Sequence, residues 1–311
     1  MNDPRIPTIM IVGSMCMDLV TYAGRLPERG ETVIGERFAT GFGGKGANQA
    51  TMAARLGARV SMTGGVGDDP YGAMTIENLA TQGIDTSGIR RIPGPTGVAP
   101  IWVEPDGSNR IIVVPGANGA LRPADGADPV AAADALDVVV GQFEIDQAVT
   151  AAAFAAARER GAATILNPAP AAPVTPALLA VTDWLIPNET ELAAAAGGRC
   201  DPMSDADLAA AAAALGVRLV VTLGEKGAAL VRTDGTVDRI AAPRVEATDT
   251  TGAGDAFVGA FAWALGSGRD EGTAVLIAIA LSADSVTRAG TQTSFADPER
   301  AAALVAGVRG A

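Results

Sequence analysis

The sequence contains no histidine, and this absence excludes several kinds of active site. Hydrolysis by a Ser-His-Asp triad, catalysis by a Cys-His pair and zinc held by histidine all require an imidazole. Cysteine is nearly absent too, since only Cys16 and Cys200 occur, far apart and without C-x-x-C spacing. We therefore expect no disulfide framework and a protein of a reducing compartment.

Positive charge is also scarce. The 23 lysines and arginines stand against 35 aspartates and glutamates, which gives a formal net charge of −12, and the longest basic run is Arg90-Arg91. We therefore expect neither nucleic acid nor a membrane as a partner. No apolar run is long enough to span a bilayer, and residues 1–7 lack the order of a signal peptide, so we expect a cytoplasmic protein.

The sequence does contain a regular alternation of short apolar strands with helices. Hydrophobic residues make up 48% of the 311 positions, enough for a large core. Fully apolar strands separated by helices predict an α/β fold with a mostly parallel central sheet and helices on both faces. The expected strands are 8–12, 60–63, 137–140, 164–166, 184–186 and 219–223, with a terminal antiparallel pair at 228–232 and 237–241. The expected helices include 46–56, 71–82, 146–160, 205–215, 254–265 and 271–283.

Two segments, 19–39 and 97–114, follow a different pattern. The first alternates weakly, and the second alternates with period two around a hairpin turn at 105–109. Neither can form a core of its own, so we expect them to pair as a small β-sheet lid over the active site. The predicted division assigns 1–15, 40–93 and 118–311 to an α/β domain that binds nucleotide and substrate, and 16–39 and 94–117 to the lid.

The heptapeptide from Asp249 to Asp255 reads Asp-Thr-Thr-Gly-Ala-Gly-Asp and leads directly into an apolar helical stretch at 256–261. Small residues at 252–254 let the backbone approach an anion, and the start of a helix points N–H groups at it. An acid there would repel a phosphate unless it accepts a proton from the attacking group. The segment therefore predicts phosphoryl transfer to a hydroxyl, while an ordinary N-capped helix after a glycine turn is the alternative.

The glycine-rich loop at 41–48 contains a literal G-x-G-x-x-G, but its context argues against a dinucleotide fold. The loop does not follow the first strand, and the strand at 60–63 runs into glycines without the acid that a dinucleotide site needs. A Walker A loop also fails, because Lys45 is followed by glycine. Lys45 and Asn48 supply donors suited to a polyhydroxylated ligand, and a flexible turn before a helix is the simpler alternative.

Residues 43–67 resemble the first motif of the ribokinase family of sugar kinases (the phosphofructokinase-B superfamily), and residues 249–262 resemble its second motif. Shorter matches lie in the family's order at 167–170, 188–191, 222–224 and 290–292, so the resemblance spans nearly the whole chain. It implies a kinase that uses ATP to phosphorylate the 5-hydroxyl of D-ribose, with Mg²⁺ and K⁺ as further cofactors. It also implies a homodimer formed through the lid.

The same resemblance implies roles for individual residues. Asp255 would be the general base, and Gly252, Ala253 and Gly254 would form the anion hole for the transferred phosphate. The implied sugar ligands are Cys16, Asp18, Gly44, Lys45, Gly46, Asn48 and Glu144. The implied nucleotide ligands are Asn188, Thr222, Gly224, Lys226, Gly227 and Gly254, with Glu191 near Mg²⁺. From their spacing alone, Asn188 and Glu191 would form a capping box at a helix start.

A monovalent cation site is implied as well, built largely from backbone oxygens that suit a large, weakly hydrated ion. Its implied residues are Asp249, Thr251, Ser285, Arg288, Gly290 and Ser294. Without the resemblance, Asp249 would be a simple loop acid.

One position departs from the family. Ribokinases commonly carry Gly-Ser-x-Asn-x-Asp after the first strand, whereas residues 13–18 here read Gly-Ser-Met-Cys-Met-Asp. A thiol is a poor hydrogen-bond partner, so Cys16 weakens the preference for a sugar that carries the matching hydroxyl. We prefer D-ribose as the substrate, because the resemblance implies that this is the more common activity of the family. A close alternative is 2-deoxy-D-ribose, since the family's 2-deoxyribose kinases carry an apolar residue here. Another sugar or nucleoside kinase, a sugar-binding regulator and an NAD-dependent oxidoreductase are the remaining alternatives.

Overall fold

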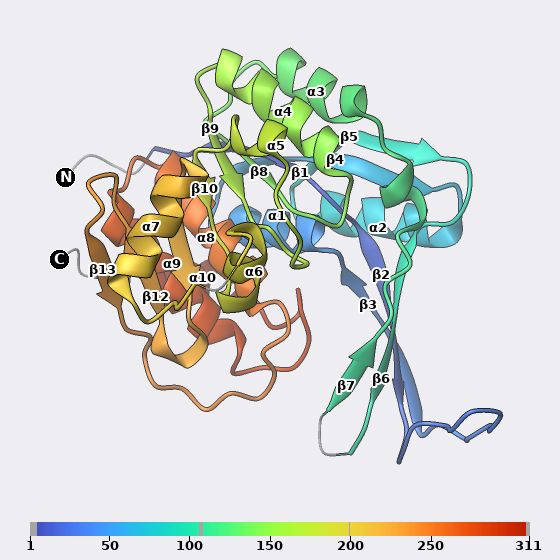
Figure 1. Cartoon of the computed structure of the whole chain (residues 1–311). Helices are drawn as coiled ribbons and strands as arrows, with labels where there is room; N and C mark the ends of the chain where they lie inside the picture. The colour runs from blue at the N-terminus through green and yellow to red at the C-terminus, as the bar shows by residue number, and fades with distance from the viewer. Residues whose placement is uncertain (1–4, 106–107, 199, 309–311) are drawn as a thin grey trace.

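The computed structural model describes residues 5–105, 108–198 and 200–308, which build two sheets of different size (Figure 1). The larger sheet has nine strands in the order β13-β12-β11-β10-β9-β8-β1-β4-β5. All neighbours from β5 to β11 pair in parallel, and β12 and β13 continue the sheet in antiparallel pairing. The prediction of a mostly parallel α/β sheet is confirmed. The strands are β1 (Thr8–Val12), β4 (Arg59–Gly67), β5 (Asp85–Ile92), β8 (Val138–Gly141), β9 (Ala163–Leu166), β10 (Trp184–Leu185), β11 (Arg218–Thr222), β12 (Ala228–Val231) and β13 (Val237–Ile240).

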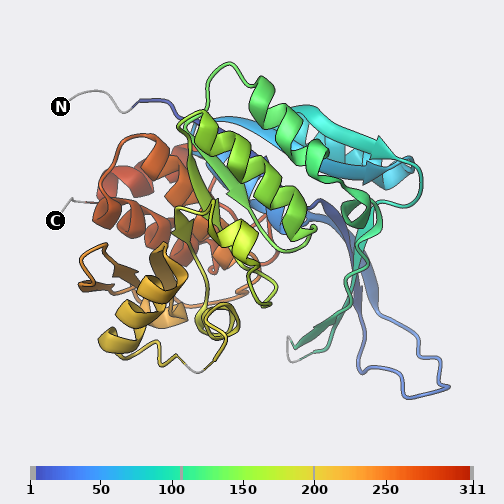
Figure 2. The ribbon, with the colours of Figure 1, turned by 45° about the horizontal axis from the view of Figure 1, so that its top comes forward.

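Helices cover both faces of the large sheet (Figure 2). Successive side chains of a strand point to opposite faces, so Ile9 and Ile11 of β1 join one hydrophobic core while Met10 and Val12 join the other. The first core is closed by α1 (Lys45–Arg55), α2 (Pro70–Thr81), α8 (Ala253–Gly266), α9 (Glu271–Ser285) and α10 (Pro298–Gly307). The second is closed by α3 (Pro123–Ala132), α4 (Gln147–Glu159), α5 (Pro176–Leu179), α6 (Glu189–Ala195) and α7 (Asp205–Leu215).

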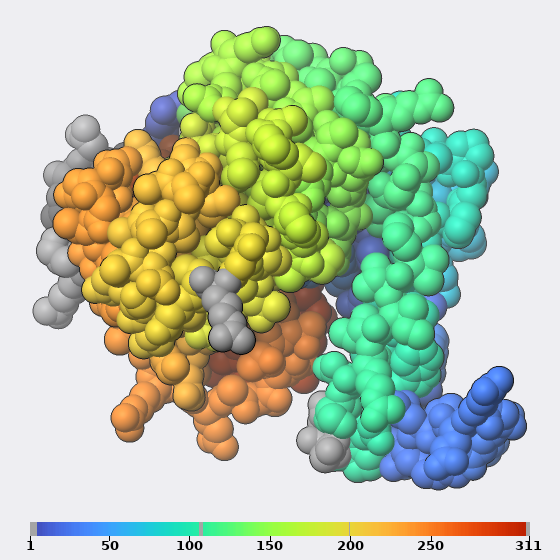
Figure 3. Space-filling model, in the orientation of Figure 1, coloured from blue at the N-terminus to red at the C-terminus, as the bar shows by residue number. Residues whose placement is uncertain are grey.

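The smaller sheet projects away from this body and is joined to it at one end (Figures 1 and 3). Its order is β3-β2-β6-β7, formed by β2 (Cys16–Tyr22), β3 (Arg37–Gly43), β6 (Gly97–Val103) and β7 (Asn109–Ile111). β2 and β6 pair in parallel, so the two segments expected to form a small sheet do so. β2 begins before residue 19 and β3 continues past residue 39, while residues 106 and 107 of the expected turn lie outside the described residues. The division into a domain and a lid stays a prediction.

Several elements were not expected from the sequence. They are the edge strand β5, the helices α3, α5 and α10, and the short 3-10 helices η1 (Gly116–Ala120) and η2 (Gly224–Lys226). Within the described ranges, no helix has both the length and the apolar character needed to cross a membrane.

Candidate active site

Several of the residues expected at the site meet where parallel strands of the large sheet end. In open α/β sheets this carboxyl edge is where ligands bind. A pocket of about 220 Å³ opens there, between the residues that follow β9, β10 and β11 and the N-terminus of α8. It brings together expected catalytic and nucleotide residues from distant points of the chain. Its lining is Lys45, Asn167, Ala169, Ile186, Asn188, Glu191, Thr222, Thr250, Gly252, Gly254, Asp255 and Val258.

The start of α8 is made of small residues. Gly252 is the N-cap with a φ of 78°, a left-handed conformation that favours glycine, and a Cβ there would lie 2.7 Å from Cγ2 of Thr291. A Cβ on Gly254 would meet no atom within 4 Å, because this residue faces open space in the pocket. Ser282 of α9 donates a hydrogen bond to the carbonyl of Ala253 at 2.8 Å and so ties the turn to the next helix. An open backbone at a helix N-terminus is suited to hold an anion.

Asp255 lies in the first turn of α8 and is only 5% exposed, yet it lines the pocket. Its carboxylate accepts hydrogen bonds from Nδ2 of Asn48 at 2.9 Å and from Nε2 of Gln49 at 3.0 Å. The charge of Asp255 raises the pKa of the Lys45 amine, against the opposing effect of burial. Lys45, which the resemblance implies as a sugar ligand, lines the same pocket as Asp255, the expected base.

Two further carboxylates of the expected sugar site, Asp18 and Glu144, belong to the same charged group. Oε2 of Glu144 accepts hydrogen bonds from the hydroxyl of Ser14 at 2.5 Å and from the backbone N–H of Lys45 at 2.9 Å. A Cβ on Gly43 would lie 2.3 Å from Oδ1 of Asp18, so a glycine is needed for this close approach. Burial, and then the charges of Glu144 and Asp255, raises the pKa of Asp18 to about 7.

Gly44 and Gly46 bring the start of α1 against the connection between β1 and β2. Gly44 has a φ of 91°, and a Cβ on it would lie 2.8 Å from the backbone of Met15. A Cβ on Gly46 would lie 2.7 Å from the backbone nitrogen of Ser14. Both glycines therefore allow the contact that sets Asn48, in the first turn of α1, against Asp255.

Cys16 opens β2 and is 4% exposed. Burial, and then the charges of Glu144 and Asp18, raises the pKa of its thiol to about 12, so the thiol is neutral near pH 7. Asn118 of η1 donates to its Sγ at 3.6 Å and also bonds the backbone N–H and carbonyl of Met15, at 3.1 and 2.8 Å. Asn118 could not be selected from the sequence, because its partners are more than a hundred residues away along the chain.

The expected nucleotide and magnesium residues Asn188, Thr222 and Glu191 lie in the pocket. Asn188 and Glu191 also form the capping box predicted from their spacing: Oδ1 of Asn188 accepts from the Glu191 N–H at 2.8 Å, and Oε2 of Glu191 accepts from the Asn188 N–H at 2.9 Å. Burial raises the pKa of Glu191. The two readings of this pair are therefore compatible, since capping places both side chains at the edge of the pocket.

Three other expected nucleotide residues, Gly224, Lys226 and Gly227, lie outside the lining of this pocket. Gly224 and Lys226 are exposed on η2. Gly227 is buried with a φ of 94°, and a Cβ on it would lie 2.0 Å from the carbonyl oxygen of Ile240. A glycine is therefore needed at position 227 for the chain to pack against the end of β13.

The expected cation residues lie on two segments of the chain, residues 249–251 just before α8 and residues 285–294 at and after the end of α9. Asp249 accepts hydrogen bonds from the backbone N–H groups of Thr251 and Gly290, both at 2.9 Å, and so joins the two segments. Burial would raise the pKa of Asp249, but these hydrogen bonds outweigh it and the pKa is lowered. Arg288 donates to the carbonyl of Ser294 at 2.9 and 2.6 Å. The monovalent cation site therefore stays a prediction. Among the described residues, no group of three Cys, Asp or Glu side chains could hold a metal ion.

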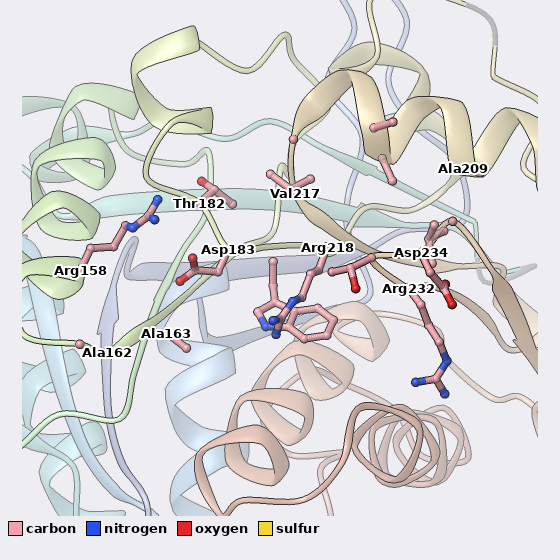
Figure 4. A pocket seen from close by; sticks show the side chains of 18 residues that line it. Arg158, Ala162, Ala163, Thr182, Asp183, Ala209, Val217, Arg218, Arg232 and Asp234 are labelled. Carbon is pink, nitrogen blue, oxygen red and sulfur yellow. The ribbon is translucent and has the colours of Figure 1, made fainter.

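A larger cavity of about 970 Å³ lies at the other end of the sheet, by the first residues of β9, β10 and β11 (Figure 4). Arg158, Arg218 and Arg232 line it together with Asp183 and Asp234. The guanidinium of Arg218 lies 5.2 Å from the Trp184 ring centroid and 3.4 Å from Glu271, and Arg232 pairs with Asp238. Arg218 and Arg232 are thus already paired with acids, Arg158 donates to the carbonyl of Ala180, and the cavity lies at the opposite end of the strands from the residues expected to react.

Comparisons with known proteins agree with this geometry. Residues 7–298 match the model of the pfkB family carbohydrate kinase. The deoxyribokinase of Salmonella typhi is 38% identical over 298 residues, which cover 94% of this chain and 96% of that protein. The ribokinase of Schizosaccharomyces pombe is 36% identical over 299 residues, covering 92% and 94%. The structure of Arabidopsis thaliana ribokinase complexed with ribose and ATP superposes with a TM-score of 0.88 at 32% identity, covering 97% of this chain and 99% of that one.

Proposed function

The chain belongs to the pfkB family of carbohydrate kinases and is an ATP-dependent sugar kinase, and from this premise we propose that it phosphorylates the 5-hydroxyl of D-ribose. The observation that carries the proposal is the position of Asp255, a buried carboxylate that lines a pocket beside the glycine-rich start of α8. The relatives named ribokinase, one of them solved with ribose and ATP, support the choice of sugar and nucleotide.

In the proposed reaction, Asp255 accepts the proton of the 5-hydroxyl as its oxygen attacks the terminal phosphorus of ATP. A new P–O bond forms, the bond to the bridging oxygen breaks, and ADP leaves. The backbone of Gly252, Ala253 and Gly254 holds the transferred group, whose charge develops on its equatorial oxygens. Lys45 adds a positive charge beside Asp255.

The sugar would lie between the small sheet and α1. Asp18 and Glu144 would accept hydrogen bonds from its hydroxyls, and Asn48 would donate to it. Cys16 would contact it through a neutral thiol, and the backbone of residues 44–46 would line the site. Glu144 is already held by Ser14 and by the Lys45 N–H, so its position is fixed before the sugar binds.

Metal ions complete the proposal. Glu191, with Asn188 beside it, would lie near a Mg²⁺ ion that neutralises phosphate charge when bound. The loop containing Asp249, Thr251 and Gly290 would hold K⁺ next to the anion hole, together with Ser285, Arg288 and Ser294. Asn188 and Thr222 would contact the nucleotide phosphates, and Gly224, Lys226 and Gly227 would lie further along the ATP site.

The deciding experiment is Asp255→Asn. We expect kcat to fall by roughly 10²–10⁴-fold, because the amide cannot take up the proton, while ribose and ATP still bind. Coupled assays of ADP release and calorimetric titration measure the two effects. Glu246→Gln, which neutralises an exposed acid of the preceding loop, should leave both unchanged. Unchanged turnover in Asp255→Asn would remove Asp255 from the base role.

A second substrate, 2-deoxy-D-ribose, is favoured by one specific observation. Cys16 is a buried, neutral thiol at the position where an asparagine would contact a sugar hydroxyl. The similarity to a protein named deoxyribokinase supports the same alternative. The phosphoryl-transfer chemistry would be identical, since the 5-hydroxyl is present in both sugars.

A further inference from the structure

One row of buried side-chain amides ends on Asp255 from the side of β8. Nε2 of Gln142, just after β8, donates to Oε1 of Gln49 at 2.6 Å. Nε2 of Gln49 in turn donates to Oδ1 of Asp255 at 3.0 Å and also contacts Oδ1 of Asn167 at 3.2 Å. Gln142 and Gln49 are both 0% exposed. The row therefore connects the middle of the sheet to the expected base without reaching solvent.

A second row ends on the other carboxylate oxygen. Nδ2 of Asn78 donates to Oε1 of Gln292 at 3.1 Å, with a longer contact of 3.5 Å from Gln82. Nε2 of Gln292 donates to Oδ1 of Asn48 at 3.0 Å, and Nδ2 of Asn48 donates to Oδ2 of Asp255 at 2.9 Å. Each oxygen of the carboxylate is thus held by one row.

Both rows run in the same direction, with every nitrogen donating toward Asp255. An ionised carboxylate only accepts hydrogen bonds, so it requires a nitrogen to face it, and each amide then presents its oxygen to the next donor. The far ends show what this direction leaves unpaired: Oε1 of Gln142 and Oε1 of Gln82 are buried and accept no hydrogen bond among the described residues. Unpaired buried acceptors are unfavourable, which suggests that the arrangement serves the carboxylate.

We propose that Gln49 is a positioning residue for Asp255, and that Gln142 fixes the orientation of the Gln49 amide. The inference rests on the proposed role of Asp255 as the base. With one oxygen tied to Gln49 and the other to Asn48, the carboxylate cannot rotate, and its remaining lone pairs are free to receive the proton of the sugar. Asn48 is also an expected sugar ligand, whereas Gln49 is fully buried, so Gln49 alone separates positioning from binding.

Gln49→Met tests the proposal, because methionine keeps the length of the side chain and removes the donor. We expect kcat to fall about 10- to 100-fold while the KM values for sugar and ATP change by less than about twofold. A rise in KM with unchanged kcat would contradict a role in positioning the base. Thr51→Val is the matched control: it removes a buried hydroxyl of α1 that has no partner among the described residues, and should leave kcat unchanged. A loss in this control equal to that in Gln49→Met would also overturn the proposal.

A double variant separates positioning from stability. Gln49→Met leaves Nε2 of Gln142 without its acceptor and should lower the Tm. Gln49→Met/Gln142→Leu also removes that unpaired donor, so the Tm should recover part of the loss while kcat stays low. Recovery of kcat together with the Tm would mean that Gln49 only stabilises the fold, and the proposal would fail.

Comparison with Asp255→Asn distinguishes the two possible failures. If Asp255→Asn keeps its turnover, the base assignment and this inference fail together. If Asp255→Asn loses its turnover but Gln49→Met keeps the wild-type kcat, the kinase mechanism stands and only the role of Gln49 is wrong.

Discussion

Three carboxylates, Asp18, Glu144 and Asp255, share a largely buried site with one lysine. Like charges at close range oppose one another's ionisation, and burial adds to the effect. Asp18 carries the consequence, since its pKa is raised to about 7 by burial first and then by Glu144 and Asp255. In the sugar-free protein Asp18 is therefore about half protonated near pH 7.

The affinity for sugar should depend on pH through Asp18. A carboxylate accepts hydrogen bonds from sugar hydroxyls better than a protonated carboxyl does, so binding favours the ionised form. We expect the Kd for sugar to fall as the pH rises from about 6 to about 8, approaching a tenfold change per unit below the pKa. Calorimetric titration across this range measures it, and Asp18→Asn should remove most of the slope. An equal slope in that variant would assign the titration to another group.

The carboxyl of Asp18 should also make the free energy of unfolding depend on pH, and this quantity should fall as the pH rises, whereas the affinity for sugar rises. The pKa of Asp18 is raised from 3.8 to about 7 on folding, so the folded chain holds the extra proton between these values. Its contribution to the free energy of unfolding is present below pH 4 and is lost as the pH rises through about 7. Thermal melts of the sugar-free protein should show Asp18→Asn becoming more stable relative to wild type as the pH rises over this window.

Cys16 should decide between ribose and 2-deoxyribose. Its thiol makes weak hydrogen bonds, and the nearby amide of Asn118 is already engaged with Met15. In Cys16→Asn, a new amide can bond the 2-hydroxyl, so the ratio of kcat/KM for D-ribose to that for 2-deoxy-D-ribose should rise roughly 10- to 100-fold. Cys16→Val, which adds no polar atom, should leave the ratio near its wild-type value. If the asparagine gains nothing for ribose, this position does not face the 2-hydroxyl.

Among single residues, the sequence predicts best those candidate site residues that lie together in one short segment of the chain. Asp255 and the glycines before it lie in a single heptapeptide whose chemistry can be read directly, and the structure brings them into one pocket. Gln49 and Asn118 could not be selected, because their meaning depends on partners brought close only by folding. Lys226 is expected at the nucleotide site only through the family resemblance, and nothing in the sequence predicts that it lies exposed outside this pocket.

At the scale of the helix, two glycines at the start of α8 offer a matched pair. Gly252→Ala forces a left-handed φ on a residue with a Cβ and sets that Cβ 2.7 Å from Thr291. We expect a loss of about 1–2 kcal/mol in the free energy of unfolding from the φ alone, together with a loss of activity. Gly254→Ala has room for its Cβ, and alanine is the better helix former, so the Tm should be kept or raised. Its kcat should fall, since the methyl group enters the pocket where the transferred phosphate is proposed to bind. Denaturant unfolding and steady-state assays compare the two, and a fully active Gly254→Ala would exclude close approach of the phosphate there.

The elements that the sequence predicts are those whose pattern is local. β1 and the other central strands are continuous apolar runs, and they lie where expected. β5 was missed because it is an edge strand with alternating exposed positions, including Asp85 and Arg91, that resembles a loop. α3 contains Pro129, a residue that normally breaks helices, and it is held by packing against α4, where a Cβ on Gly126 would lie 2.7 Å from the Val149 carbonyl oxygen. Tertiary contacts decide such elements, and a single sequence does not display them.

For the whole molecule, the small sheet raises the question of what covers its apolar side chains. At one edge of this sheet, Phe38 of β3 is 62% exposed and Ile34, in the connection before β3, is 90% exposed. At the opposite edge, Ile111 of β7 and the following Ile112 and Val113 are exposed as well. Exposed apolar groups gathered on a projecting element are typical of an interface. We propose that a second copy of the chain covers these side chains. The small sheet has no core of its own, and packing against the same sheet of a second subunit would bury its apolar residues.

The stability of the proposed dimer should depend on two opposing interactions, and changing the salt concentration distinguishes them. Each chain carries a net charge of −12, so two copies repel one another at low ionic strength, whereas burial of apolar surface attracts them. Screening shortens the repulsion to a few ångströms near 1 M salt, so we expect light scattering to show a dimer that persists or strengthens as salt is added. Phe38→Glu/Ile112→Glu should shift it to monomer and raise the KM for sugar, because the small sheet forms one wall of the expected sugar site. Met203→Glu, at an exposed methionine outside the small sheet, is the matched control and should remain dimeric. If the wild-type protein is a monomer at working concentration, or if its dimer dissociates when salt is added, then the apolar residues of the small sheet do not form a dimer interface.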